Sequence, residues 1–164
     1  MNIVLSGMPG SGKTTVSLIL GKMLGAEVLD TDAVITAKHG EISKIFENHG
    51  EEYFRELESL AVEEVCAKSG AIISTGGGCL LRERNRDNLK SSGKIVFLRT
   101  SLSELLKRTA GDTSRPLLQG EKRQRLEKLI NERTPVYEEC ADITVDTDGL
   151  TPEQVAIKIT ELLK

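Results

Sequence analysis

The chain places Gly7-Met8-Pro9-Gly10-Ser11-Gly12-Lys13-Thr14 directly after an apolar run at residues 2–6 and directly before a helical stretch over about residues 13–24. These residues fit the pattern Gly-x-x-x-x-Gly-Lys-Ser/Thr in the context that the pattern requires. Glycines let the backbone wrap phosphate oxygens, so that consecutive N–H groups and the positive end of the helix point at the anion. The alternative is a chance glycine-rich turn, but the complete pattern favours phosphate binding.

The phosphate loop predicts a nucleotide site for ATP and Mg²⁺. Lys13 is expected to reach the β- and γ-phosphates and to stabilise the transferring group, which makes it a catalytic residue. The Thr14 hydroxyl is expected to ligate Mg²⁺. The predicted cofactor-binding residues of this segment are Gly10, Ser11, Gly12, Lys13, Thr14 and Thr15.

Apolar runs alternate with helical segments along the whole chain. We predict strands at residues 2–6, 27–30, 71–74, 94–98 and 142–145, and helices at 13–24, up to about 49, 51–69, from 101, 122–139 and from 151. Such alternation implies an α/β fold, a three-layer α/β/α sandwich with a five-stranded parallel sheet that binds ligands at the carboxyl ends of its strands. Two sequences predict capping boxes at helix starts, Ser101-x-x-Glu104 and Thr151-Pro152-Glu153-Gln154.

Composition limits the partners and the setting of the protein. The length of 164 residues favours a single domain spanning 1–164. A net charge of −3 and an aromatic content of 3% argue against a nucleic-acid surface. No apolar run approaches the roughly 20 residues that span a membrane. Three cysteines without C-x-x-C spacing argue against disulfides or a zinc site, so a cytoplasmic location is expected.

Asp30 and Asp32 follow the second predicted strand, beside the phosphate loop. Asp30 is a candidate for orienting the Mg²⁺ site, and Asp32 for accepting the proton of an acceptor hydroxyl or orienting that hydroxyl. The alternative is that Asp30 or Thr31 caps the following helix, which is compatible with those roles. A GTPase is not indicated, because the chain has no Asn-Lys-x-Asp segment, and neither the third nor the fourth strand ends in the acidic residue of motor NTPases.

Several ordered motifs together resemble the shikimate kinases, and the likeness covers nearly the whole chain. Besides the phosphate loop, these are Leu29-Asp30-Thr31-Asp32, Gly50-Glu51-x-x-Phe54-Arg55-x-x-Glu58, Gly76-Gly77-Gly78, Arg115-Pro116-Leu117-Leu118 and Arg133-x-Pro135-x-Tyr137. The resemblance implies transfer of the ATP γ-phosphoryl group to the 3-hydroxyl of shikimate, a step toward aromatic amino acids. It also implies a P-loop fold like that of the nucleoside monophosphate kinases, with strand order 2-3-1-4-5 and a mobile lid.

The resemblance further implies roles for individual residues. Asp32 would hold the reactive hydroxyl, and Arg55 and Arg133 the substrate carboxylate. The glycine triplet, Gly76, Gly77 and Gly78, would contact the substrate, through the Gly77 backbone in particular. Substrate-binding helices are expected at about residues 32–60 and a lid at about 111–121. The lid residue Arg115 would touch the phosphates as a catalytic and cofactor-binding residue, and Arg108 would lie against the adenine.

The chemistry of the side chains agrees with these roles. Planar guanidinium groups suit a carboxylate. Arg55 and Glu58 share a helix face, so Glu58 can hold the guanidinium, although an ordinary solvated ion pair is the alternative. The glycine triplet allows close approach of a ligand, or is a flexible turn. The lid would exclude water during transfer, or is a plain surface loop. Adenine contacts near Asp148-Gly149-Leu150 are expected to be mostly backbone.

Two other functions stay open at this point. One is a kinase of the same fold that acts on gluconate or a nucleoside monophosphate, although a nucleotide acceptor would not need two arginines for one carboxylate. The other is a non-catalytic nucleotide-binding module, which would be expected to lack Asp32 or Arg115. We expect a monomer that binds ATP and shikimate, and neither nucleic acid nor a membrane.

Overall fold

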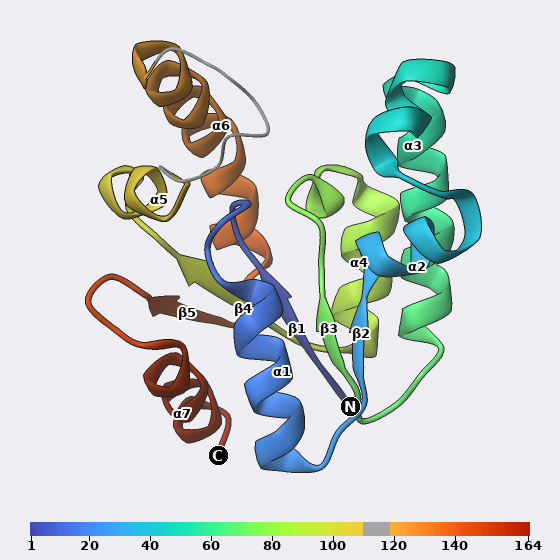
Figure 1. Ribbon diagram of the computed structural model, residues 1–164. Helices are drawn as coiled ribbons and strands as arrows, with labels where there is room; N and C mark the ends of the chain where they lie inside the picture. Colours follow the sequence, from blue (N-terminus) through green and yellow to red (C-terminus); the bar gives the residue numbers. More distant parts are fainter. Residues whose placement is uncertain (110–118) are drawn as a thin grey trace.

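The computed structural model describes residues 1–109 and 119–164 of the chain. Figure 1 shows a central parallel sheet of five strands in the order β2-β3-β1-β4-β5. The expected parallel sheet and its strand order are therefore confirmed. The strands are β1 (Asn2–Ser6), β2 (Val28–Asp30), β3 (Ile72–Ser74), β4 (Gly93–Arg99) and β5 (Ile143–Asp146).

Helices cover both faces of the sheet (Figure 1). They are α1 (Lys13–Leu24), α2 (Thr31–His39), α3 (Ile42–Cys66), α4 (Glu83–Ser92), α5 (Leu102–Thr109), α6 (Gln119–Cys140) and α7 (Pro152–Leu162), with a short 3-10 helix η1 (Cys79–Leu81) after β3. Neighbouring residues of a strand point to opposite faces. Val4 of β1 packs in a core with α3, α4 and α6, whereas Leu5 packs in a core with α1 and α7. The expected three layers are confirmed.

A separate apolar cluster joins α2 to α3 beside the carboxyl end of β2. Ile35 of α2 packs there with Ile45, Phe54 and Leu57 of α3. Gly50 interrupts α3 with φ 83° and ψ 174°, a conformation that suits glycine. The interruption matches the predicted break between a helical stretch up to about residue 49 and a helix from 51. It re-aims the second part of α3, which carries Arg55.

Some sequence-based boundaries were wrong. The predicted loop at 111–121 is helical from Gln119, because a helix that forms downstream can extend through Gly120 at a cost of only about 1 kcal/mol. The rest of that loop, including Arg115, lies outside the described residues. Helix α3 ends at Cys66, before the predicted 69. Helix α4 was not predicted.

The two predicted capping boxes had different outcomes. At α7, Thr151 and Gln154 exchange both hydrogen bonds, so the capping box is confirmed. At α5, the Ser101 hydroxyl accepts from the Glu104 N–H, but the Ser101 N–H donates to Asp148 Oδ1 at 3.1 Å. Glu104 does not close the box because its carboxylate pairs with Arg108.

In the described ranges, no helix is long and apolar enough to cross a membrane.

Candidate active site

The phosphate loop lies between β1 and α1, at the carboxyl edge of the sheet. Gly10 and Gly12 have φ values of 86° and 95°, which residues with a side chain rarely adopt. At Gly7, a Cβ would come within 2.7 Å of the Leu98 carbonyl oxygen, so the loop also needs glycine to lie against β4. The glycines therefore permit the tight loop between β1 and α1 that the phosphate-loop pattern requires.

The Lys13 side chain folds back over the loop. Its Nζ donates to the carbonyl oxygens of Gly7 at 2.7 Å and Met8 at 3.0 Å. Burial lowers the pKa of Lys13 from 10.5 to about 8, although the charges of Asp32 and Asp30 oppose that shift. The Arg133 charge lowers the pKa of Lys13 further. Arg133 of α6 comes near the phosphate loop, since a Cβ on Gly77 would lie 2.8 Å from Pro9 Cδ and 2.9 Å from Arg133 Nη1.

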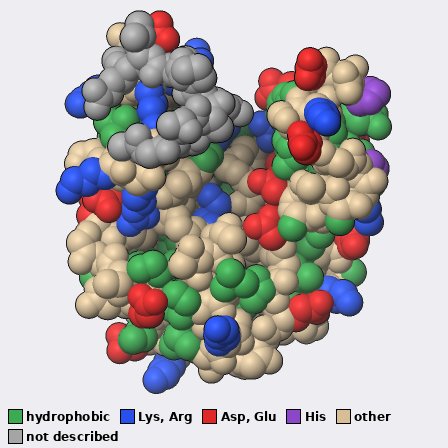
Figure 2. All heavy atoms as spheres, viewed as in Figure 1, with side chains coloured by type: hydrophobic (Ala, Val, Ile, Leu, Met, Phe, Trp, Pro, Cys, Tyr) green, Lys and Arg blue, Asp and Glu red, His purple; other side chains and the backbone are tan. Residues whose placement is uncertain are grey.

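A cavity of about 680 Å³ opens over the phosphate loop. Figure 2 shows this side of the molecule hollowed between the α2–α3 side and the α5–α6 side. The predicted site residues that line the cavity are Gly10, Ser11, Gly12, Lys13, Thr14, Thr15, Asp30, Asp32, Gly76, Gly77 and Arg108. The phosphate cradle, the acidic pair and the first two glycines of the triplet therefore share one space. Arg55, Gly78 and Arg133 are not among the residues that line the cavity.

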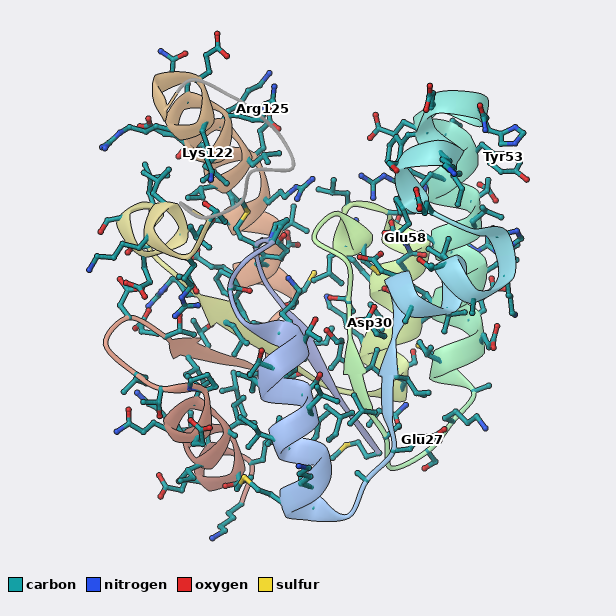
Figure 3. The ribbon with its side chains drawn as sticks, viewed as in Figure 1. Glu27, Asp30, Tyr53, Glu58, Lys122 and Arg125 are labelled. Atoms are coloured by element: carbon teal, nitrogen blue, oxygen red, sulfur yellow. The ribbon has the colours of Figure 1, made fainter. Side chains whose placement is uncertain are left out.

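Asp30 and Asp32 lie where β2 ends and α2 begins. Asp30 Oδ1 accepts from the Ala33 N–H at 3.1 Å, so the predicted helix cap is confirmed. Figure 3 shows Asp30 and Glu58 toward the cavity end of the fold, whereas Glu27 lies at the opposite end of β2. Burial raises the pKa of Asp32, and the Asp30 charge raises it further, against the opposing charges of Lys13 and Arg55. Asp32 is thus a half-buried carboxylate with a strengthened tendency to take up a proton.

The glycine triplet is the point at which three side chains predicted to bind the acceptor converge. A Cβ on Gly76 would lie 2.8 Å from Asp32 Oδ1, and one on Gly77 would lie 2.9 Å from Arg133 Nη1. A Cβ on Gly78 would lie 2.6 Å and 2.7 Å from the two terminal nitrogens of Arg55. The triplet therefore leaves room for a carboxylate and two guanidinium groups that come from three different elements.

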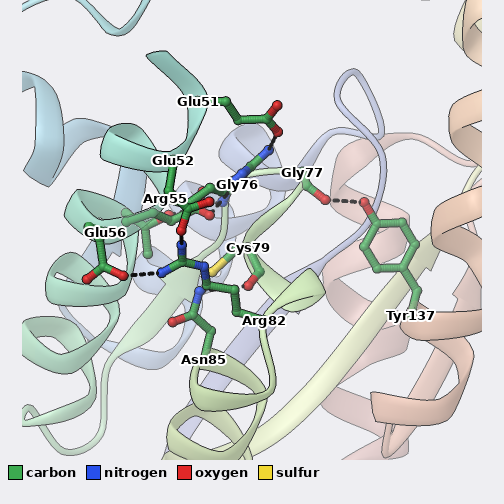
Figure 4. Close-up of polar contacts among 12 residues, drawn as sticks. Glu51, Glu52, Arg55, Glu56, Gly76, Gly77, Cys79, Arg82, Asn85 and Tyr137 are labelled. Atoms are coloured by element: carbon green, nitrogen blue, oxygen red, sulfur yellow. Dashed lines mark hydrogen bonds and ion pairs between the residues drawn. The ribbon is translucent and has the colours of Figure 1, made fainter. Parts of the chain in front are cut away.

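Arg55 is held from its own helix. Its Nη1 donates to Glu58 Oε1 at 2.9 Å. Its Nη2 lies 3.5 Å from Glu51 Oε1 (Figure 4). Glu58 is 1% exposed, so this is not an ordinary solvated ion pair. Burial raises the pKa of Glu58, while the Arg55 charge and its hydrogen bond oppose that rise. The predicted Arg55–Glu58 contact is confirmed.

The end of the cavity where the sequence predicts the adenine is lined by α5, by the segment after β5 and by α7. Arg108 Nη1 donates to the Gly10 carbonyl oxygen at 3.3 Å, and its Nε pairs with Glu104 at 3.3 Å. Arg108 and Leu150, which the sequence predicts near the adenine, both line this end. Its other lining residues were not predicted, namely Glu104, Thr147, Pro152 and Val155. In the segment Asp148-Gly149-Leu150, Asp148 Oδ1 instead accepts a hydrogen bond from the Ser101 N–H.

The cavity offers hard oxygen donors where a metal-bound phosphate chain would lie. Thr14 and Asp30 both line it, and hydroxyl and carboxylate oxygens are ligands that Mg²⁺ accepts together with phosphates and water. No group of three or more His, Cys, Asp or Glu side chains that could hold a metal by itself occurs in the part of the chain outside 110–118. This donor set fits a cation that arrives with a nucleotide.

Comparisons with known proteins agree on one family. A family model described as shikimate kinase matches residues 9–164. The shikimate kinase of Caldicellulosiruptor bescii is 43% identical over 163 residues, covering 98% of this chain and 94% of that protein. The shikimate kinase of Thermodesulfovibrio yellowstonii is 44% identical over 160 residues, covering 96% and 92%.

Solved structures give the same result. Shikimate kinase from Acinetobacter baumannii in complex with shikimate superposes with a TM-score of 0.92 at 40% identity, covering 99% of this chain and 92% of that one. Shikimate kinase from Aquifex aeolicus gives 0.87 at 36% identity, covering 99% and 96%. The likeness thus extends over nearly the full length of both chains.

Proposed function

This chain belongs to the shikimate kinase family, and we propose that it transfers the γ-phosphoryl group of ATP to the 3-hydroxyl of shikimate, giving shikimate 3-phosphate and ADP. One observation carries the assignment of the acceptor site. Asp32, Arg133 and Arg55 approach three consecutive glycines at the rim of the cavity that contains the phosphate loop. A carboxylate-bearing polyol matches that arrangement, because it has an anion for the guanidinium groups and hydroxyls for the carboxylate.

The nucleotide half of the proposal assigns the phosphates to the loop at residues 7–15. Backbone N–H groups around Gly10, Ser11 and Gly12 bind the phosphates, with Thr15 at the start of α1. Lys13 donates to the β- and γ-phosphates, and Arg108 lies against the adenine. Thr14 would ligate Mg²⁺ and Asp30 would orient the ion's ligands, and the bound ion would supply positive charge to the phosphates.

The acceptor half assigns a position to each reacting group. Arg55 and Arg133 bind the shikimate carboxylate, and Gly76, Gly77 and Gly78 allow the ring to approach the backbone. Asp32 orients the 3-hydroxyl for in-line attack and accepts its proton, a role that suits a carboxyl group whose pKa burial has raised. Lys13 stabilises the charge of the transferring group.

Arg115 belongs to the proposal by its sequence motif, since it lies outside the described residues. We propose that the lid at about 111–121 brings Arg115 onto the phosphates and excludes water during transfer. The whole chain, 1–164, then acts as a single kinase domain in which helices at about 32–60 bind the acceptor. We further propose a cytoplasmic monomer that works on small molecules and not on nucleic acid or a membrane.

A coupled ADP-release assay tests the function. Shikimate, gluconate and CMP are supplied side by side as acceptors with ATP and Mg²⁺. We expect rapid ADP release with shikimate alone, and a phosphate on the 3-hydroxyl when the product is examined by NMR. Faster turnover with gluconate or CMP would indicate that the protein is a gluconate or nucleoside monophosphate kinase of this fold. No acceptor-dependent turnover would favour a non-catalytic nucleotide-binding module.

A further inference from the structure

Two buried side chains outside the proposed binding set fasten the backbone of the glycine triplet. The Tyr137 hydroxyl donates to the Gly77 carbonyl oxygen, and Tyr137 is 2% exposed (Figure 4). The Gly76 N–H donates to Thr31 Oγ1 at 3.0 Å, and Thr31 is fully buried. The triplet is therefore tied to α6 on one side and to the start of α2 on the other.

The Tyr137 contact fixes more than one oxygen atom. A peptide group is planar, and in its trans form the C=O and N–H point in opposite directions. The bond from Tyr137 to the Gly77 oxygen therefore directs the N–H of Gly78 away from Tyr137. Figure 4 shows Arg55 on the other side of Gly77 from Tyr137. The Gly78 N–H thus faces the side on which Arg55 lies.

These backbone donors are available for a ligand. Within residues 1–109 and 119–164, the N–H groups of Gly77 and Gly78 have no hydrogen-bond acceptor. Glycine has a conformationally permissive backbone, so these N–H groups would not keep one direction unless other groups fixed their peptide planes. The Tyr137 bond fixes the Gly77–Gly78 peptide, and the Cys79 N–H, which donates to the Gly76 carbonyl oxygen at 3.1 Å, fixes the Gly76–Gly77 peptide. Thr31 holds the Gly76 N–H at the start of the triplet.

Tyr137 is also linked to the carboxylate-binding arginine of its own helix. Arg133 and Tyr137 are four residues apart on α6 and share a face, and both reach Gly77. The Tyr137 ring packs against Phe97 of β4 with ring centroids 5.0 Å apart, which fixes the ring. Burial raises the pKa of Tyr137 to about 12, so its hydroxyl remains a donor at neutral pH.

We propose that Tyr137 and Thr31 are positioning residues for acceptor binding: they hold the backbone of the glycine triplet so that the N–H groups of Gly77 and Gly78 point at the acceptor. The proposal rests on the proposed function for the identity of that acceptor. The two residues touch the backbone of the triplet and not the reacting atoms.

Steady-state kinetics of Tyr137→Phe test the first residue. The phenylalanine keeps the packing against Phe97 and removes only the hydroxyl. We expect the shikimate KM to rise about 5- to 20-fold, the loss of one well-placed hydrogen bond, while the ATP KM changes less than about twofold. Tyr53→Phe, at the other tyrosine of the chain, is the matched control, because Tyr53 is exposed on α3. An unchanged shikimate KM in Tyr137→Phe would overturn the proposal.

Thr31 supplies a second pair of variants. Thr31→Val keeps the shape but removes the acceptor of the Gly76 N–H, and Thr31→Ser restores an oxygen at that position. We expect Thr31→Val to raise the shikimate KM and Thr31→Ser to restore it. Equal rises in the shikimate and ATP KM values in both variants would indicate a purely structural role and contradict the proposal.

A measurement without turnover separates this inference from the proposed function. In ¹⁵N-labelled protein without substrate, we expect Tyr137→Phe to shift or broaden the amide signals of Gly77 and Gly78, while Tyr53→Phe leaves them in place. Unchanged glycine signals would overturn the positioning role even if the enzyme phosphorylates shikimate. Shifted signals in a protein that does not phosphorylate shikimate would support the positioning role and contradict the proposed function alone.

Discussion

Arg55 and Gly78 lie in direct contact, although they belong to α3 and to the segment after β3. A Cβ on Gly78 would come within 2.6 Å of Arg55 Nη1 and 2.7 Å of Nη2. Glu58 also holds this guanidinium, with 2.9 Å between Arg55 Nη1 and Glu58 Oε1. The orientation of Arg55 thus depends on the absence of a Cβ at Gly78 as much as on the ion pair with Glu58.

The Gly78→Ala variant tests this contact. The added methyl group must displace the Arg55 guanidinium, because a separation of 2.6 Å is shorter than real Cβ contacts. We expect the shikimate KM to rise about tenfold or more, the loss of one charge-assisted hydrogen bond, with the ATP KM little changed. In an Arg55→Ala background the same substitution should add almost nothing. Fully additive effects would show that the alanine acts elsewhere.

Arg55→Ala and Arg133→Ala should each weaken acceptor binding. Each removes a guanidinium from a carboxylate, so we expect the shikimate KM to rise about 10- to 100-fold. Arg84→Ala is the control, since Arg84 forms an exposed pair with Glu63 of α3, and exposed pairs contribute little. Changes in ATP affinity without changes in the shikimate KM would show that the carboxylate site is misassigned.

Asp32→Asn should affect chemistry more than nucleotide binding. The amide cannot accept the proton of the 3-hydroxyl, so we expect kcat to fall at least about 100-fold, with the Kd for ADP within about twofold of wild type. Glu27→Gln removes the same charge at the opposite, exposed end of β2 and should leave kcat unchanged. A near-normal kcat in Asp32→Asn would remove Asp32 from the mechanism.

The lowered pKa of Lys13 predicts a pH dependence of nucleotide binding. In the free protein Lys13 loses its proton as the pH rises through about 8. Nucleotide phosphates favour the charged amine. Above pH 8, ADP binding is therefore accompanied by uptake of a proton at Lys13, whereas below that pH Lys13 already carries the proton. We expect the affinity for ADP to fall by up to about tenfold per pH unit above pH 8.

Calorimetric titration of ADP from about pH 7 to about pH 9.5, in buffers with different ionisation enthalpies, measures both the affinity and the proton uptake. Lys13→Arg keeps its positive charge throughout this range and should show no uptake of this origin. Wild-type binding without proton uptake above pH 8 would mean that Lys13 does not meet the phosphates.

Much of the fold was predictable because its signals are local. The phosphate loop has a contiguous pattern, and the buried strands of a parallel sheet are short apolar runs. Helix α4 gave no such signal. Its sequence, Glu83–Ser92, buries only Asn85 and Leu89, so it has no apolar stripe to recognise. Asn85 instead holds the Cys79 carbonyl oxygen at 2.9 Å, a tertiary contact.

The candidate site likewise contains residues that sequence motifs could predict and residues that they could not. Lys13, Thr14 and Asp32 could be proposed from motifs next to strand ends. The roles of Thr31 and Tyr137 could not, because their hydrogen bonds join residues 45 and 60 positions apart. The burial of Glu58 was equally hidden, since an Arg-x-x-Glu pair on a helix is usually solvated. Only the packing of α3 against the glycine triplet turns it into a buried support for Arg55.

The specificity for a carboxylate tests the central claim most directly. The measurement is the ratio of kcat/KM for shikimate to kcat/KM for its methyl ester, in wild type and in Arg55→Ala. Two guanidinium groups on one carboxylate predict a wild-type ratio of at least about 100, and a ratio within about tenfold of unity in the variant. A wild-type enzyme that used the ester as well as the acid would contradict the account.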